Sequence, residues 1–197
     1  MVRDLFETTI QWMRTGERAS SSLNVGQATT IGDHGQATTT GAYGKAVAHG
    51  FYSHATATGA RGQAVASSRQ GHATASGDMG LAIASGAHGH ATASGDAGQA
   101  LALGEHSDAT ASGDGGLAIA SCMGCQAKAS GDGGLAIASG YLGEATAGPN
   151  GIVVVAWFDM ARTRKRLAVG YVGEGGIEPG VTYVVRDGAL VRKDGAR

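Results

Sequence analysis

A nine-residue repeat fills most of this chain and limits the folds open to it. From Gly26 to Leu142, thirteen consecutive units follow the pattern small-x-Ala-x-Ala-x-Gly-x-x without insertion or deletion, and a partial unit follows at 143–148. The third position is alanine in every unit, and the first and seventh are nearly always glycine. Self-similarity at a fixed short period is typical of a solenoid, in which each repeat packs only on its neighbours.

Each unit predicts one short strand closed by a turn, because apolar and polar residues alternate with period two between glycines. From Thr38 onward, the fourth position alternates between threonine and a branched apolar residue in successive units, with Lys128 in one threonine position. We therefore expect a coil of two units, or eighteen residues, with one strand on each of two opposed sheets. The predicted fold is all-β: a two-sided β-solenoid, or β-roll.

The alanines are expected to face inward. The opposite choice would bury His54, His72 and His90 without hydrogen-bond partners, at a cost of roughly 1–3 kcal/mol each. With the alanines inside, the interior is dry and thin, and the solenoid has one polar and one apolar outer face.

Three regions follow from these patterns. Residues 1–16 carry apolar side chains at three- and four-residue spacing, which predicts an N-terminal helix that caps the first coil or docks to a partner. Residues 17–148 form the β-solenoid, with 17–25 as a degenerate extra unit. Residues 149–197 form a small C-terminal β module.

Within this module, 152–158 and 166–172 are predicted as strands joined by a loop over 160–165. Residues 181–186 and 189–191 are predicted as a hairpin over Asp187-Gly188, a dipeptide that favours a type I′ turn. The basic loop residues are interpreted as either a solvated hairpin or a contact with phosphate or nucleic acid. They are Arg162, Arg164, Lys165 and Arg166.

Composition narrows the function classes. Glycine accounts for 35 of 197 residues and aromatics for 5%, so no conventional large core is available. A net charge of −1 argues against nucleic acid as a partner. The longest apolar run, 152–158, is too short to cross a bilayer, and the N-terminus lacks the apolar stretch of a signal peptide. We expect a chain that is cytoplasmic at synthesis and able to join a virion.

The apolar outer face predicts a homo-oligomer. Two flat faces of this kind are self-complementary, which favours a two-fold dimer, with a trimer as the alternative. Leu103 widens the column of predicted interface residues, which comprises Val47, Val65, Leu81, Ile83, Leu101, Leu117, Ile119, Leu135 and Ile137.

Two ladders of ionisable side chains recur every eighteen residues. His54, His72 and His90 continue into Asp108, and neighbours about 4.8 Å apart either share a metal ion or form a stack of solvated neutral imidazoles. We expect the second reading, with no cofactor and no metal. The other ladder consists of turn residues that are expected to bond their own turn amides: Asp78, Asp96, Asp114 and Asp132.

That second ladder invites comparison with calcium-binding nonapeptide rolls, although their Gly-Gly-x-Gly-x-Asp pattern is missing. The rows of Thr-x-Thr, such as Thr56 and Thr58, resemble the ice-binding face of insect antifreeze solenoids, which implies ice binding as a further alternative. Cys122 and Cys125 have C-x-x-C spacing, but both hold glycine positions of the repeat. They are therefore either a redox pair or small-residue substitutions.

No catalytic motif emerges from the sequence. It lacks a phosphate-binding loop, a Gly-x-Ser-x-Gly elbow and a His-Glu-x-x-His pair. We therefore expect the protein not to be an enzyme.

The repeat and the tail, with its Ile-Val-Val-Val-Ala-Trp-Phe-Asp and Ile-Glu-Pro-Gly-Val-Thr-Tyr segments, resemble uncharacterised bacterial and phage nonapeptide-repeat β-solenoid proteins. A looser similarity exists to the head repeats of trimeric autotransporter adhesins. The resemblance implies a β-solenoid encoded by a phage or mobile element. The expected function is a non-enzymatic structural or binding protein, a rigid oligomeric rod that presents surfaces to a protein partner. The alternatives are a phage inhibitor of a host defence protein and a metal- or ice-binding solenoid.

Overall fold

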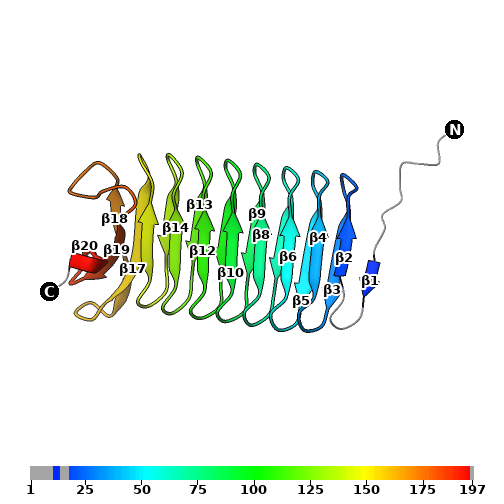
Figure 1. Ribbon diagram of the computed structural model, residues 1–197. Helices are drawn as coiled ribbons and strands as arrows, with labels where there is room; N and C mark the ends of the chain where they lie inside the picture. Colours follow the sequence, from blue (N-terminus) through cyan, green and yellow to red (C-terminus); the bar gives the residue numbers. More distant parts are fainter. Residues whose placement is uncertain (1–10, 14–17, 196–197) are drawn as a thin grey trace.

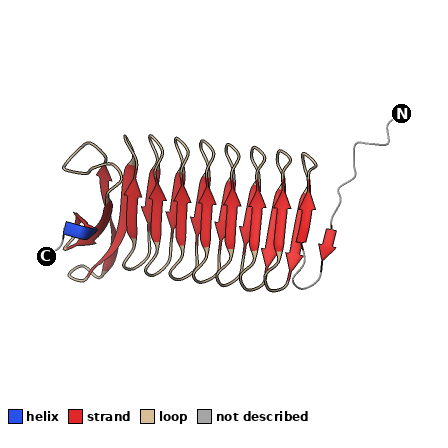
Figure 2. Cartoon of the chain, in the orientation of Figure 1, coloured by secondary structure: helices blue, strands red, loops and turns tan. Residues whose placement is uncertain are grey.

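The computed structural model describes residues 11–13 and 18–195, and these residues form one elongated β-solenoid (Figure 1). Two ten-stranded sheets run along the rod, and successive strands of the array alternate between them. Strands dominate this part of the chain, with one short 3-10 helix, η1 (Lys193–Gly195), near the carboxyl-terminal end (Figure 2). The predicted all-β solenoid is confirmed.

The sheets are named A and B. Sheet A consists of β1 (Gln11–Met13), β3 (Gln27–Ile31), β5 (Lys45–His49), β7 (Gln63–Ala66), β9 (Leu81–Ala84), β11 (Gln99–Ala102), β13 (Leu117–Ala120), β15 (Leu135–Ala138), β17 (Ile152–Asp159) and β18 (Arg164–Tyr171). Sheet B consists of β2 (Arg18–Ser21), β4 (Gln36–Thr39), β6 (His54–Ala57), β8 (His72–Ala75), β10 (His90–Ala93), β12 (Asp108–Ala111), β14 (Gln126–Ala129), β16 (Glu144–Ala147), β19 (Thr182–Arg186) and β20 (Ala189–Arg192).

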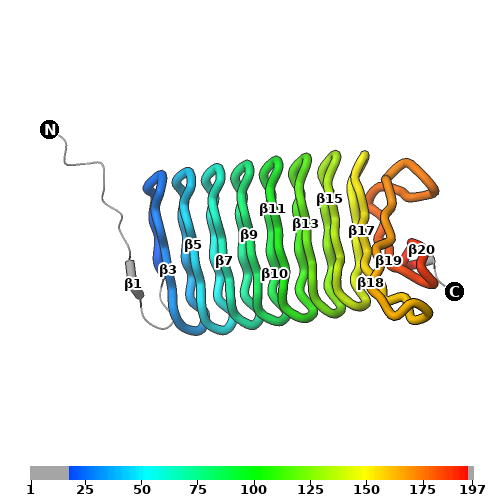
Figure 3. The backbone as a smooth tube through the Cα atoms, turned by 180° about the vertical axis from the view of Figure 1, so that it is seen from behind, coloured from blue at the N-terminus to red at the C-terminus, as the bar shows by residue number. Residues whose placement is uncertain are grey.

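The coil has eighteen residues. Neighbouring strands within each sheet of the array are parallel and in register at this spacing, as in the pairing of Ala28 with Ala46 and of Ala91 with Ala109. Alanines at the third and fifth repeat positions are buried in the described coils, with at most 1% of their surface exposed. The predicted coil length and the inward alanines are therefore confirmed. Seen from behind, the odd-numbered strands of sheet A follow one another along the rod from β3 to β17 (Figure 3).

Glycine is favoured at the seventh position by the contact between coils, and Ser68 and Cys122 replace it in two of the units. A Cβ added to Gly59 would lie 2.1 Å from the carbonyl oxygen of Gly41, and one added to Gly77 would lie 2.3 Å from that of Gly59. Carbon and oxygen atoms cannot approach so closely, so a side chain at Gly59 or Gly77 would push the neighbouring coils apart. The strand spacing of about 4.8 Å thus explains why this glycine recurs.

The N-terminal helix is not found where the structure describes the chain. Residues 11–13, which fall within the predicted helix, form β1, and β1 pairs in parallel with β3. The rest of that prediction, 1–10 and 14–16, lies outside the described residues. An edge strand offers unpaired backbone groups to a neighbouring segment, which accounts for strand pairing in place of a helix. The degenerate unit is confirmed, because β2 pairs with β4 and Ala19 is buried.

At the carboxyl-terminal end, sheet A changes from parallel to antiparallel pairing. β17 pairs in parallel with β15 and then antiparallel with β18, and the turn between them spans 160–163, which is shorter than predicted. β17 has eight residues, whereas the array strands have four or five. β17 therefore continues as a strand at the point where the chain of each preceding coil makes its turn.

Sheet B ends in the predicted hairpin. β19 pairs antiparallel with β16 and β20, and Asp187 and Gly188 have φ angles of 51° and 86°, as a type I′ turn requires. Tyr183 is only 2% exposed. Its hydroxyl accepts a hydrogen bond from the Glu178 amide at 2.8 Å and donates one to the Gly176 carbonyl at 3.3 Å. The ring thus supplies the bulk that fills the widened end of the core.

Candidate interaction surfaces

The apolar column lies on the outer face of sheet A. Its members occupy equivalent positions on consecutive strands, as shown by the pairing of Val65 with Ile83 and of Ile119 with Ile137. Each alternates with a buried alanine along its strand, so its side chain points away from the core. The flanking Leu117 and Leu135 are also paired neighbours. Register therefore brings the predicted interface residues together on one face.

The apolar face continues into the carboxyl-terminal strands, which sequence reasoning missed. Ile137 pairs with Val154, and Val154 pairs with Val169. Directly paired residues share one face of a sheet, so Leu167 and Tyr171 of β18 extend the same surface. The exposed fractions of Val169, Leu167 and Tyr171 are 50%, 63% and 53%. The alternation within 152–158 continues that of the repeat and could have revealed this extension.

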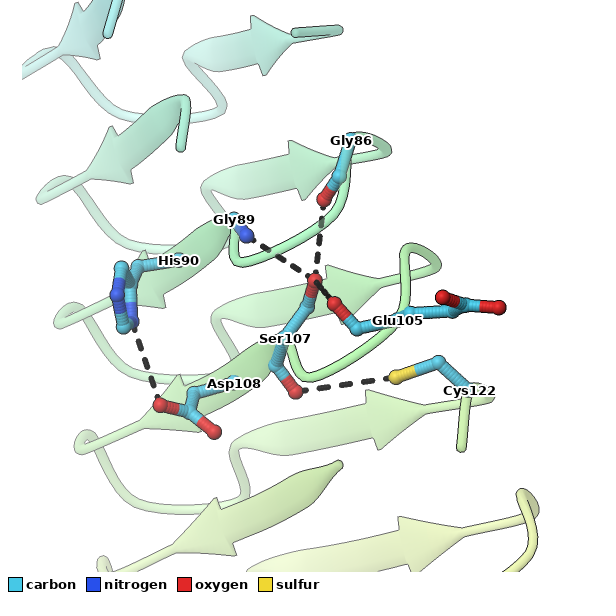
Figure 4. A network of polar contacts seen from close by, with 7 residues as sticks. All are labelled: Gly86, Gly89, His90, Glu105, Ser107, Asp108 and Cys122. Atoms are coloured by element: carbon cyan, nitrogen blue, oxygen red, sulfur yellow. Dashed lines mark hydrogen bonds and ion pairs between the residues drawn. The ribbon is translucent and has the colours of Figure 1, made fainter. Parts of the chain in front are cut away.

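The polar outer face of sheet B carries the histidine column. Nδ1 of His72 lies 3.5 Å from Nε2 of His54, and the rings of His72 and His90 are stacked with centroids 4.9 Å apart. Nδ1 of His90 lies 3.3 Å from a carboxylate oxygen of Asp108 (Figure 4). Burial lowers the pKa of His72, and the charges of His54 and His90 lower it further. The lowered pKa favours a neutral imidazole at His72.

Among the described residues, no group of three or more His, Cys, Asp or Glu side chains could hold a metal ion. The histidines are aligned but meet in pairs. The threonine column beside them is regular from Thr38 to Thr110. Lys128 then interrupts it, and Thr146 is covered by Thr182, whose hydroxyl lies 2.9 Å from its own.

The aspartate ladder bonds between coils, so the prediction that each carboxylate bonds its own turn was wrong. Carboxylate oxygens of Asp78 and Asp96 accept hydrogen bonds from the amides of Asp96 and Asp114, at 3.3 and 3.1 Å. Asp114 and Asp132 continue the pattern, accepting from the Asp132 amide and the Asn150 side chain. A short carboxylate reaches the next coil because stacked strands are only about 4.8 Å apart. The ladder therefore ties successive turns together.

The two cysteines are free and buried, at 7% exposure for Cys122 and 0% for Cys125. The Cys125 thiol donates to the Cys122 carbonyl at 2.7 Å, and the Cys122 thiol donates to the Ser107 carbonyl at 3.8 Å (Figure 4). Burial, followed by the contact with Cys125, raises the pKa of Cys122 to about 12. A thiol that stays protonated is a poor nucleophile, which favours small-residue substitution over a redox pair.

Strand β18, which carries Arg164, Lys165 and Arg166, lies beside a groove at the carboxyl-terminal end. A cleft of about 870 Å³ opens between the end of β17, the turn before β16 and the β19–β20 hairpin. Trp157 and Phe158 line it, together with Arg186 and Lys193. Sequence reasoning gave these aromatics a packing role only. The sequence does indicate this feature, because the Gly-x-x turn of the repeat is absent after Val155.

No helix among the described residues is long and apolar enough to cross a membrane. Comparison with protein-family models, with curated protein sequences and with solved structures finds no match to this chain.

Proposed function

We propose that this protein is a non-enzymatic, rigid rod that dimerises through the outer face of sheet A. Its ends and the Thr/His face of sheet B remain available to a protein partner. The observation that carries the proposal is the continuity of the apolar face, from Val47 in the array to Val169 and Leu167 in the last strand of the sheet.

The size of this face supports a dimer. The column in the array alone exposes roughly 300–400 Å², which is comparable to the largest apolar patch on a typical monomer. A stable interface buries about 800 Å² on each partner. The extension over β17 and β18 brings the face closer to that size, and its exposed members are large: Leu167, Val169 and Tyr171.

A two-fold arrangement suits a flat surface that meets a copy of itself, because each contact then occurs twice. A trimer would bring only part of each face into contact. The dimer leaves sheet B outside, where the polar threonine and histidine columns stay hydrated. The resemblance of the repeat and tail to phage proteins supports a phage-encoded rod that serves as a structural component.

The non-enzymatic part of the proposal rests on how the ionisable groups are used. His90 contacts Asp108, the aspartate ladder holds turns together, and Cys122 keeps its proton at neutral pH. Each of these groups has a structural partner. Most of the chain therefore serves to build the shape and the outer surfaces of the rod.

The dimer is tested by placing charge on the apolar face. Ile83→Lys combined with Ile119→Lys should yield monomers, because lysines buried in the interface would be desolvated without partners. The matched control is Thr74→Lys with Thr110→Lys, one strand earlier in each case but on the opposite face. It should remain a dimer.

Sedimentation velocity measures the mass, and circular dichroism checks that each variant is folded. A monomeric wild-type protein, or a control that dissociates as readily as the isoleucine variant, would refute the assignment of the interface.

A further inference from the structure

The carboxyl-terminal groove exists because β17 does not turn. In each preceding coil the sheet A strand is followed by a tight turn that leads into sheet B. After Val155 the chain instead continues through Ala156 and Trp157 to Asp159, and returns as β18. The end of sheet A therefore overshoots sheet B. The space left between them is the cleft of about 870 Å³.

Trp157 is the centre of this region. It lines the large cleft and two neighbouring hollows of about 420 and 80 Å³. Its indole is fixed by the β19–β20 turn, since a Cβ added at Gly188 would lie 2.9 Å from Cζ2 of the ring. The groove walls are thus two antiparallel hairpins that meet at one aromatic side chain. Such a site is preformed and need not be ordered on binding.

The rim of the groove is apolar and exposed. Tyr141 and Leu142 each have 68% of their surface exposed, Phe158 has 44% and Met160 has 80%. Large side chains of this kind, gathered around a concavity, are typical of protein-binding surfaces. Tyrosine, tryptophan, phenylalanine and methionine are the residue types enriched in the cores of interfaces. The rim therefore offers anchoring contacts for apolar side chains of a partner.

The charges around the groove are unbalanced. Arg166 lies 3.6 Å from Asp159, and Lys193 lies 2.8 Å from Glu144, so both of these acidic groups are paired. Within the described part of the chain, three exposed basic residues that line the cleft or the neighbouring hollow of about 420 Å³ take part in no ion pair. They are Arg164, Lys165 and Arg186, and Asp187 is the remaining acidic residue in the lining. The excess positive charge favours an acidic partner.

Charges on an edge strand also prevent unwanted strand pairing, and β18 is the last strand of sheet A. That role accounts for Arg164 and Lys165. It does not account for Arg186, which lies on the other hairpin, nor for the exposed apolar rim. The combination of features on both walls points to a ligand.

We infer that the groove binds an acidic, amphipathic segment of a protein partner. Apolar side chains of the segment contact the rim around Trp157, and its carboxylates pair with Arg164, Lys165 and Arg186. This rests on the proposed function in one respect, that the rod presents its ends to a protein. A nucleic acid fits less well, because Leu142 and Met160 on the exposed rim offer no hydrogen-bond donors to phosphates.

The test uses the full-length protein and a phage-displayed library of random twelve-residue peptides as the probe. Enriched peptides should combine aspartate or glutamate with aromatic or aliphatic residues. One such peptide is then synthesised with a fluorescent label and titrated by anisotropy at low and high salt. Its affinity should fall as salt rises, because the charge pairs are partly exposed.

Tyr141→Ser with Arg186→Glu should weaken binding about tenfold or more, since it removes an anchor and reverses a charge. The matched control is Phe51→Ser with Arg69→Glu, an exposed aromatic and a basic residue on turns nearer the N-terminus. It should bind as the wild type does. Circular dichroism confirms that both variants are folded.

Three outcomes would overturn the inference: enriched peptides without acidic residues, equal loss in the control, or tighter binding of a single-stranded oligo-dT. Sedimentation of the same samples separates this result from the dimer. A monomer that still binds the peptide refutes only the dimer, and a dimer that does not bind it refutes only the groove.

Discussion

The two ends of the rod fill the same narrow interior differently. In the first coils, Thr30 and Thr39 take the place of inward alanines and are at most 1% exposed. Their hydroxyls have no hydrogen-bond partner within the described structure. At the other end, Val155 and Tyr183 are as deeply buried, and the Tyr183 hydroxyl has two partners.

The difference shows what the coil geometry permits. Within the regular coils, the interior has room for a methyl group but offers no hydrogen-bond partner to a hydroxyl. Where β17–β18 and β19–β20 replace the coil, an aromatic ring fits inside and its hydroxyl has hydrogen-bond partners. We therefore expect the N-terminal coils to be the weaker end.

The largest effect is expected at the carboxyl-terminal end. Tyr183→Ala removes the largest fully buried side chain, and should lower the free energy of unfolding by about 3–5 kcal/mol. Tyr183→Phe is the control, because it keeps the ring and loses only the hydroxyl's bonds, at about 1 kcal/mol. Urea unfolding measures both. If alanine costs no more than phenylalanine, the ring does not support this end of the core.

A gain in stability is expected at the other end. Thr39→Ala removes a buried, unpartnered hydroxyl, and the next strand already holds Ala57 at the paired position. The free energy of unfolding should rise by about 1 kcal/mol. Thr38→Ala, on the outer face of the same strand, should change it by less than about 0.5 kcal/mol. A loss of stability in Thr39→Ala would contradict the weakness assigned to the N-terminal coils.

The smallest effect concerns the coils between the two ends. The pKa of His72 is lowered in the folded state, so the unfolded chain binds a proton more readily. Stability from neutral His72 is complete above its ordinary pKa of about 6.5 and declines as pH falls from there toward the lowered value.

Because the imidazole is partly exposed, the loss should stay below about 1 kcal/mol. Urea midpoints at several pH values measure it, and His72→Gln should flatten the profile. A profile that is the same with and without His72 would dismiss the effect.

Much of the fold could be predicted because the repeat determines the register. A strict period aligns every eighteenth residue, so the columns of Ile83 and His72 follow directly from the sequence. The inward alanines follow from the cost of burying histidine. The interface residues come together for the same reason.

Other features depend on distances that a repeat does not encode. The reach of Asp78 to the amide of the next coil depends on the coil spacing, and the groove depends on β17 running past its expected turn. The sequence also does not reveal the left-handed backbone at the ninth position of the repeat, because this position is often not glycine. Tyr43, Arg61 and Met79 occupy it with φ angles of 58°, 56° and 55°. The segment 11–13 pairs as a strand although its apolar spacing favoured a helix.

The alternation of the two outer faces makes the length of this rod adjustable only in whole coils. Removing eighteen residues, such as 80–97, would join equivalent points of neighbouring coils and give a shorter rod with every column intact. Removing nine would move each later strand to the other sheet, so that Ile119 would follow the threonines and Thr110 the isoleucines. In a lineage that changes rod length by duplication, pairs of repeats should therefore be gained or lost together. Gain or loss of a single repeat would exchange the two outer faces over the rest of the rod.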